Sequence, residues 1–195
     1  MRTSNNHINI SMIGESYVGK TTLANVILKK QFVNEYQPTI GGSLFSISYK
    51  INEKDTQTFY IWDTAGMEKY RSLAPVYYRD SVAAIVVYDV GNKDSFERLD
   101  DWIKYYHDIT DKKFPILIIG NKIDLPERAV SKQDAEKFAL ENKCDYLETS
   151  AKTFEGIDQI LPKLYQLTKN LELKDDVLNY VTEQQATTDD KKTCC

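Results

Sequence analysis

The sequence lacks the features that mark several classes of protein. Only three of its 195 residues are cysteines, and two of these stand at the end, so neither a disulfide framework nor a spaced cysteine metal site is expected. Its 25 basic against 29 acidic residues give a net charge of −4, which provides no positive surface for polynucleotide phosphates. It has no run of eighteen apolar residues and no apolar signal core. We therefore expect a protein made in the cytosol that binds no nucleic acid and stays soluble unless modified.

The chain does contain a regular alternation of apolar runs and stretches of helical period. Strands are expected at 7–13, 44–51, 58–62, 83–88, 115–119 and 145–147, and helices near 20–30, 69–79, 94–109, 132–142 and 156–172. The runs 44–51 and 58–62 flank a polar segment, which predicts an antiparallel hairpin at the edge of an otherwise parallel sheet. The sequence thus predicts an α/β fold, a six-stranded sheet with helices on both faces.

The length favours a single domain. Residues 1–6 are expected to be a short extension, and residues 7–173 one compact unit with a common core. After residue 173 the sequence turns polar and loses its periodicity, so residues 174–195 are expected to form a flexible tail.

The strongest chemical signal is "GESYVGKT", residues 14–21. It fits the pattern G-x-x-x-x-G-K-[ST] of a P-loop, between a predicted strand and a predicted helix. Gly14 and Gly19 would let the backbone wrap around phosphates with its N–H groups pointing inward. Lys20 would reach the β- and γ-phosphates, and the Thr21 hydroxyl would bind Mg²⁺. The predicted phosphate-binding set is Gly14, Glu15, Ser16, Tyr17, Val18, Gly19, Lys20, Thr21 and Thr22.

Two later segments predict which base is bound. "GNKIDL" and "TSAK" each follow a predicted strand, so both lie at the sheet edge where such folds bind ligands. With the P-loop in this order, residues 7 to about 172 resemble the small GTPases. The resemblance implies that Asp124 accepts from the guanine N1–H and exocyclic amine, a donor pair that adenine lacks. It further implies that Asn121 supports the base edge, Lys122 packs along the nucleotide, the Ala151 N–H meets the guanine oxygen, and Ser150 and Lys152 frame that contact.

Two further segments resemble the switch loops of this family. In "FVNEYQPTIGG", residues 32–42, Phe32 would stack across guanine, Tyr36 would cover the phosphates and Thr39 would complete the Mg²⁺ shell when a γ-phosphate is present. In "WDTAG", Asp63 would hold Mg²⁺ through water and the Gly66 N–H would meet the γ-phosphate. Loss of that phosphate would release both loops.

The resemblance breaks at Met67. The family usually has glutamine directly after D-T-A-G, where its carboxamide orients the attacking water. A thioether cannot donate a hydrogen bond, and its sulfur is a weak acceptor. The residues expected at the catalytic positions are Lys20, Gly66 and Met67, with Met67 in the place of the usual glutamine. Because Met67 lacks the carboxamide, we predict slow hydrolysis without a partner. In one branch of this family, activating proteins commonly supply an arginine and a glutamine in trans. The alternative is that Met67 is merely an apolar residue tolerated in this loop.

Within the small GTPases, "IGGSLF", "FYIWDTAG", "YRSLAPVYYRDS" and "AAIVVYDV" are most similar to Rab proteins, especially the early-endosomal subgroup. In Rabs an aromatic triad on the switch face recruits effectors, and the matching residues are Phe45, Trp62 and Tyr77. Leu44 is an alternative to Phe45, because the "GGSLF" segment reads as one residue longer than the family pattern.

The ending "KKTCC" resembles the Rab terminus that receives two geranylgeranyl groups, here on Cys194 and Cys195. Two lipid chains suffice for stable membrane residence where one is marginal, and no polybasic patch assists. The resemblance implies residence on the cytoplasmic face of endosomal or other vesicular membranes, with a cytosolic pool. The alternative is an accidental pair of exposed cysteines.

The sequence therefore predicts a P-loop fold of the small G protein type that hydrolyses GTP slowly and acts as a Rab-type switch in vesicle traffic. GTP or GDP and Mg²⁺ are its expected ligands, and its core is expected to be monomeric. The resemblance implies an exchange factor, an activating protein, a dissociation inhibitor or escort protein, and effectors as partners. One alternative is a constitutively GTP-loaded scaffold without hydrolysis. Another is a P-loop phosphotransferase, which would leave "NKID" and "SAK" without a purpose.

Overall fold

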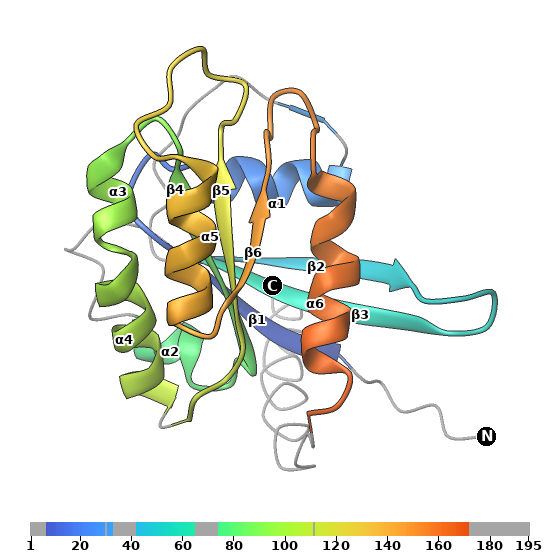
Figure 1. The fold of residues 1–195 in the computed structure, drawn as a ribbon. Helices are drawn as coiled ribbons and strands as arrows, with labels where there is room; N and C mark the ends of the chain where they lie inside the picture. The colour runs from blue at the N-terminus through green and yellow to red at the C-terminus, as the bar shows by residue number, and fades with distance from the viewer. Residues whose placement is uncertain (1–6, 30, 33–41, 65–73, 111, 172–195) are drawn as a thin grey trace, which may run out of the picture.

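The fold is built around one six-stranded sheet. A computed structural model describes residues 7–29, 31–32, 42–64, 74–110 and 112–171 (Figure 1). The strands are β1 (His7–Ile13), β2 (Gly42–Lys50), β3 (Thr56–Thr64), β4 (Ala83–Asp89), β5 (Ile116–Asn121) and β6 (Asp145–Glu148). Their order is β2-β3-β1-β4-β5-β6, and only β2 and β3 pair antiparallel. The predicted sheet, mostly parallel with an antiparallel edge strand, is confirmed.

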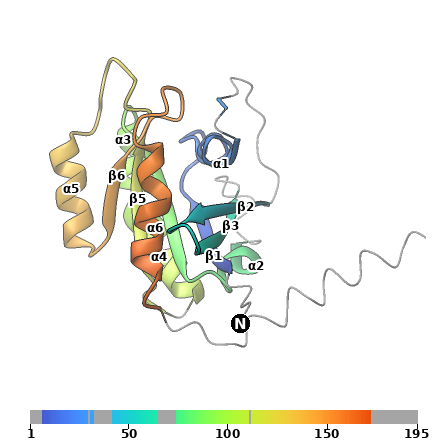
Figure 2. The ribbon, with the colours of Figure 1, turned by 90° about the vertical axis from the view of Figure 1, so that its right-hand side faces the viewer.

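Helices cover both faces of this sheet. They are α1 (Lys20–Lys29), α2 (Ala74–Tyr78), α3 (Lys93–Glu97), α4 (Leu99–Thr110), α5 (Lys132–Glu141) and α6 (Ile160–Thr168), with a 3₁₀ turn, η2 (Ile157–Gln159), before α6. Buried side chains of α1 and α6 form one core with the sheet, and those of α2, α4 and α5 form the other. Figure 2 shows α5 and the β2–β3 hairpin at opposite ends of the sheet.

The strands differ in sequence because they differ in burial. The central strands β4, "AAIVVYD", and β5, "ILIIGN", are almost wholly buried, as expected for parallel strands covered on both faces. The edge strand β2 buries only Ile47 and alternates exposed with partly buried side chains along the rest of its length. Because β1, β4, β5 and β6 run parallel, their carboxyl ends lie along the same edge of the sheet.

Several predicted boundaries were wrong. The side chain of Asn52 accepts hydrogen bonds from the N–H groups of Lys54 and Asp55, so the hairpin turns tightly and β3 begins earlier, at Thr56. The helix expected at 94–109 is two helices, because Arg98 between them has φ −86° and ψ 0°. The last helix ends at Thr168, and Pro162 lies in its first turn, where a missing N–H costs least.

Within these described residues, none of the helices combines the length and apolar character needed to cross a membrane.

Candidate nucleotide-binding site

The P-loop joins β1 to α1 and lies against neighbouring strands. Gly14 has φ +136°, and a Cβ there would stand 2.2 Å from the carbonyl oxygen of Val87 in β4. Gly19 has φ +98°, and a Cβ there would stand 2.5 Å from the Asn121 side-chain nitrogen. Both positions therefore require glycine for packing against β4 and β5 as well as for the left-handed backbone.

Lys20 is the cation of this loop. Its side chain is 6% exposed, and Nζ donates to the carbonyl oxygens of Gly14 at 2.9 Å and Glu15 at 2.7 Å. Burial lowers the pKa of Lys20 to about 8, against the opposing effect of the nearby Asp63 and Glu15 charges. A polyphosphate bound in the loop would favour the charged ammonium and so gain from it.

Thr21 and Asp63 come together from different elements. Thr21 is the second residue of α1, and its Oγ1 donates to Asp63 Oδ2 at 2.6 Å near the end of β3. Asp63 is fully buried. A carboxylate and a hydroxyl are oxygen ligands that Mg²⁺ prefers, and Mg²⁺ is commonly held by one or two protein oxygens plus substrate phosphates. The pair therefore fits Mg²⁺. Elsewhere in the described chain, no group of three or more His, Cys, Asp and Glu side chains could hold a metal.

Asn121, at the end of β5, joins three segments that are distant in sequence. Its Nδ2 donates to the carbonyl oxygen of Val18 in the P-loop at 2.9 Å. Its Oδ1 accepts from Thr149 Oγ1 at 3.2 Å and from the Ala151 N–H at 3.3 Å. Since the side chain is 1% exposed, these hydrogen bonds form away from competing water. The P-loop, "NKID" and "TSAK" thus form one structural unit.

Asp124 is oriented by the "TSAK" segment. Its Oδ1 accepts from Ser150 Oγ at 2.6 Å, and its Oδ2 lies 3.8 Å from Lys152 Nζ. Ser150 Oγ in turn accepts from the Thr153 N–H at 3.0 Å. An ionised carboxylate has acceptor sites on both oxygens, so these contacts leave capacity for a ligand that donates.

Lys122 closes the link between the "NKID" segment and the P-loop. Its Nζ donates to the Tyr17 carbonyl oxygen at 2.7 Å and forms a 2.7 Å ion pair with Asp89 Oδ2. These two contacts compensate the charge of the lysine and tie it to the P-loop, and its packing along a nucleotide stays a prediction.

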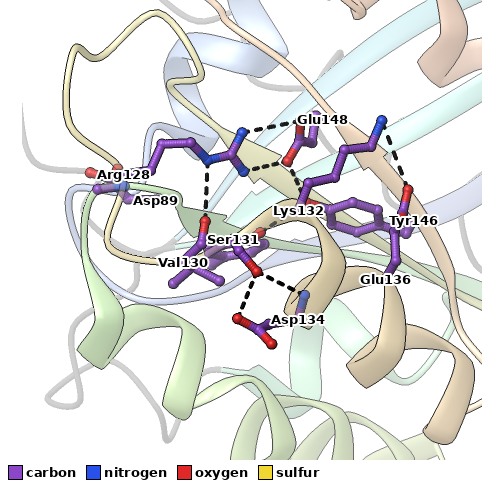
Figure 3. Close-up of polar contacts among 11 residues, drawn as sticks. Asp89, Arg128, Val130, Ser131, Lys132, Asp134, Glu136, Tyr146 and Glu148 are labelled. Carbon is purple, nitrogen blue, oxygen red and sulfur yellow. Dashed lines mark hydrogen bonds and ion pairs between the residues drawn. The ribbon is translucent and has the colours of Figure 1, made fainter.

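An ion pair that the sequence analysis missed supports the "TSAK" segment (Figure 3). The Arg128 guanidinium forms a two-pronged contact with Glu148, the residue before Thr149. Tyr146 donates to Glu148 Oε1 at 3.0 Å, and the Tyr88 and Tyr146 hydroxyls lie 2.9 Å apart. Burial acts to raise the pKa of Glu148, but hydrogen bonds from Arg128 and Tyr146 hold it below its usual value. No spacing rule links these positions, so only the opposite charges could have signalled the pair.

The strand register separates Phe45 and Leu44, the two residues that the sequence left open for the third place of the aromatic triad. In the β2–β3 register Leu44 stands opposite Trp62, and Phe45 stands opposite the buried Ile61. Phe45 packs with the core below α1 and α6. Leu44 is 48% exposed, and the Trp62 and Tyr77 ring centroids lie 5.3 Å apart. Because residues directly opposite share a face and adjacent residues alternate, Leu44 is the residue that shares this face with Trp62 and Tyr77.

The remaining predicted residues divide into two groups. Phe32 is partly buried and packs on the core formed with α1 and α6, while Ser16 and Thr22 are partly exposed in and after the P-loop. The others lie outside the described residues: Tyr36, Thr39, Gly66, Met67, Cys194 and Cys195.

Comparisons with known proteins agree with this geometry. A family model described as "Ras family" matches residues 9–170. "Ras-related protein RABF2a" of Arabidopsis thaliana is 40% identical over 172 residues, covering 87% of this chain and 84% of the relative. "GTP-binding protein ypt5" of Schizosaccharomyces pombe is 40% identical over 166 residues, covering 84% and 77%. "Ras-related protein RHN1" of Nicotiana plumbaginifolia is 38% identical over 172 residues, covering 87% and 84%.

Proposed function

The chain belongs to the Ras family, as a Rab-type small GTPase of vesicle traffic, and from this premise we propose that it is a slow, GTP- and GDP-regulated switch with Mg²⁺ at the phosphates. The observation that carries the proposal is Asn121 of the "NKID" segment, which binds the P-loop and the "TSAK" segment at once. A phosphate cradle and a base-selecting acid thereby act as one pocket. A phosphotransferase would have no use for that connection.

The base is selected by Asp124 in this proposal. Its carboxylate, held by Ser150, accepts from the two donors of guanine, while adenine would present an acceptor to an acceptor. Leaving acceptor sites of this half-buried carboxylate unfilled in a closed pocket costs enough to reject the wrong base strongly. Lys122 and the backbone of Ala151 border the same pocket and complete it.

Hydrolysis depends on charge placement at the phosphates. Lys20 would supply a positive charge to the β- and γ-phosphates, and Thr21, Asp63 and Thr39 would hold Mg²⁺, which neutralises charge on the same oxygens when bound. Tyr36 and the N–H of Gly66 would close over the γ-phosphate. Met67 cannot orient the attacking water, so we propose that an activating protein provides the missing amide.

The switch is read by other proteins and held at a membrane. We place effector recognition on Leu44, Trp62 and Tyr77, which share one face, and lipid attachment on Cys194 and Cys195. An exchange factor would load GTP, and a dissociation inhibitor or escort protein would carry the lipidated chain between endosomal or other vesicular membranes and the cytosol.

The decisive experiment measures base preference. Calorimetry with Mg²⁺ should detect tight binding of GDP and no measurable binding of ADP at the same concentrations. Asp124→Asn should lose GDP affinity and gain affinity for xanthosine diphosphate, because the carboxamide donates where xanthine carries an oxygen in place of the amine. Asp145→Asn, the same change at the start of β6, serves as the matched control and should bind as the wild type does. Equal binding of GDP and ADP would refute the proposed function.

A constitutively GTP-loaded scaffold is the second candidate, and Met67 is the observation that favours it. Nucleotide content after incubation with GTP and an activating protein separates the two. The switch should end mainly with GDP, whereas the scaffold should still hold GTP.

A further inference from the structure

The P-loop contains an acid that lies beside a site for phosphates. Glu15 directly follows Gly14, and its carbonyl oxygen accepts from Lys20 Nζ at 2.7 Å. In the proposed function Lys20 Nζ reaches the phosphates, which would therefore bind on this side of the loop. Two negative groups repel strongly when water is excluded between them, so a carboxylate turned to that side would oppose nucleotide binding. The position of the Glu15 side chain therefore matters for the loop.

The Glu15 side chain is held on the side of α4 instead. The indole Nε1 of Trp102 donates to Glu15 Oε1 at 3.0 Å, across a sequence separation of 87 residues. Arg98, immediately before α4, places Nε 3.9 Å from the same oxygen. Glu15 is thus fixed at two points, its backbone by Lys20 and its carboxylate by the start of α4.

Trp102 is the stronger of the two partners. It is 7% exposed and belongs to the buried stripe of α4 with Leu99, Ile103 and Tyr106, so the indole has little freedom to move. A buried indole N–H needs an acceptor, and a charged acceptor makes the stronger bond. The Arg98 side chain is largely exposed at a longer distance, and such ion pairs contribute little.

We propose that Trp102 is a positioning residue for nucleotide binding. Its indole N–H holds the Glu15 carboxylate against α4, which keeps this charge away from the phosphates and keeps the Glu15 carbonyl in place for Lys20. The inference rests on the proposed function, since it concerns the same phosphate site. It also makes nucleotide retention depend on α4, which contributes no other predicted nucleotide contact.

The test is a double-mutant cycle on the full chain, measured as release of fluorescently labelled GDP and GTP into excess unlabelled nucleotide. Trp102→Phe keeps an aromatic side chain, although a smaller one, and deletes the N–H. A hydrogen bond to a charged group is worth about tenfold in an equilibrium. We therefore expect release about tenfold faster, and a larger effect for GTP than for GDP because GTP carries more charge. In a Glu15→Ala background the same Trp102→Phe change should accelerate release by about twofold or less. Arg98→Ala, the control at the weaker partner, should also change release by about twofold or less.

The salt dependence of release separates positioning from packing. The acceleration by Trp102→Phe should shrink as potassium chloride rises, because salt screens a charge repulsion and leaves a packing defect unchanged. Equal acceleration with and without the Glu15 carboxylate, or no acceleration at all, would overturn the proposal.

Failure of the proposed function would give a different result. In that case the wild type would not retain guanine nucleotide, and the positioning contact would be judged without nucleotide from the Trp102 indole N–H resonance, assigned with Trp102→Phe. Glu15→Ala should move this resonance clearly upfield. An unmoved resonance would overturn the contact itself.

Discussion

At the scale of single residues, Met67 sets the expected rate of unaided hydrolysis. In the proposed function this position lies next to the γ-phosphate, and glutamine there would both donate and accept a hydrogen bond. Removal of one positioned donor costs about 10²–10³ in rate in comparable sites. We therefore expect Met67→Gln to raise the single-turnover rate of GTP hydrolysis, without an activating protein, by about 10²-fold.

Met67→Leu is the matched control for that measurement. Leucine is apolar and of similar size, so its rate should equal that of the wild type. If Met67→Gln were as slow as Met67→Leu, the residue would be a tolerated apolar side chain with no part in catalysis, and the slow rate would need another cause.

Gly120 is a second single position, where neighbouring tyrosines leave no room for a side chain. A Cβ on this β5 residue would stand 2.7 Å from the Tyr88 hydroxyl and 2.9 Å from the Tyr146 hydroxyl. Because both rings lie within the packed edge of β4, β5 and β6, Gly120→Ala should lower the free energy of unfolding by about 1–3 kcal/mol. Urea unfolding with saturating GDP measures this loss.

Tyr88→Phe is the control for the Gly120→Ala measurement, because it removes the hydroxyl that the added methyl group would overlap. Tyr88→Phe removes the nearest atom and also one hydrogen bond to Tyr146, so it destabilises the wild type. In the Gly120→Ala background the same change relieves the overlap and should cost less or become stabilising. Simple additivity of the two losses would show that the overlap is relaxed in some other way.

At the scale of elements, the two faces of β2 have separate tasks. Leu44 faces outward beside Trp62, while Phe45 packs with Ile61 in the core below α1 and α6. Leu44→Ala should therefore weaken capture of effectors by the GTP-loaded protein at least about tenfold, with little change in stability. Phe45→Ala should instead lower the free energy of unfolding by about 2–4 kcal/mol, because it opens a partly buried core position.

The two variants serve as controls for one another when stability and effector pull-down are measured on the same preparations. A stable Phe45→Ala protein with lost effector binding, beside an unaffected Leu44→Ala protein, would reverse the assignment made from the strand register.

The same elements show what a sequence can and cannot determine. The apolar runs of β4 and β5 and the P-loop pattern were found correctly, because burial on both faces and phosphate binding each demand a local composition. The sequence left both Phe45 and Leu44 open for the outward face, because an alternating strand has two possible orientations and only its register with β3 selects one. Contacts such as Trp102 with Glu15 or Arg128 with Glu148 join distant segments, so no local pattern contains them.

At the scale of the whole molecule, the three thiols are expected to differ sharply in reactivity. Burial raises the pKa of Cys144 to about 11, so at neutral pH this thiol stays protonated and reacts slowly. Cys194 and Cys195 belong to the polar segment predicted to be a tail. In the unmodified recombinant protein we expect fast labelling of two thiols at pH 7.5, and of the third only in urea. A Cys144→Ser variant should keep the fast phase, and a Cys194→Ser/Cys195→Ser variant should lose it. Fast labelling of Cys144, the one thiol left in the double variant, would contradict its burial.

In the proposed function those two cysteines carry the lipids that attach the protein to a membrane, and attachment by one lipid should differ measurably from attachment by two. Each buried methylene contributes about 0.8 kcal/mol, yet a single chain holds a protein only marginally, whereas two chains hold it stably. The net charge of −4 adds no general attraction to an acidic membrane surface. After geranylgeranylation in vitro, the wild type should therefore sediment with vesicles, Cys195→Ser should distribute between vesicles and solution, and Cys194→Ser/Cys195→Ser should remain in solution. Sedimentation of the double variant equal to that of the wild type would show that another part of the chain provides the attachment.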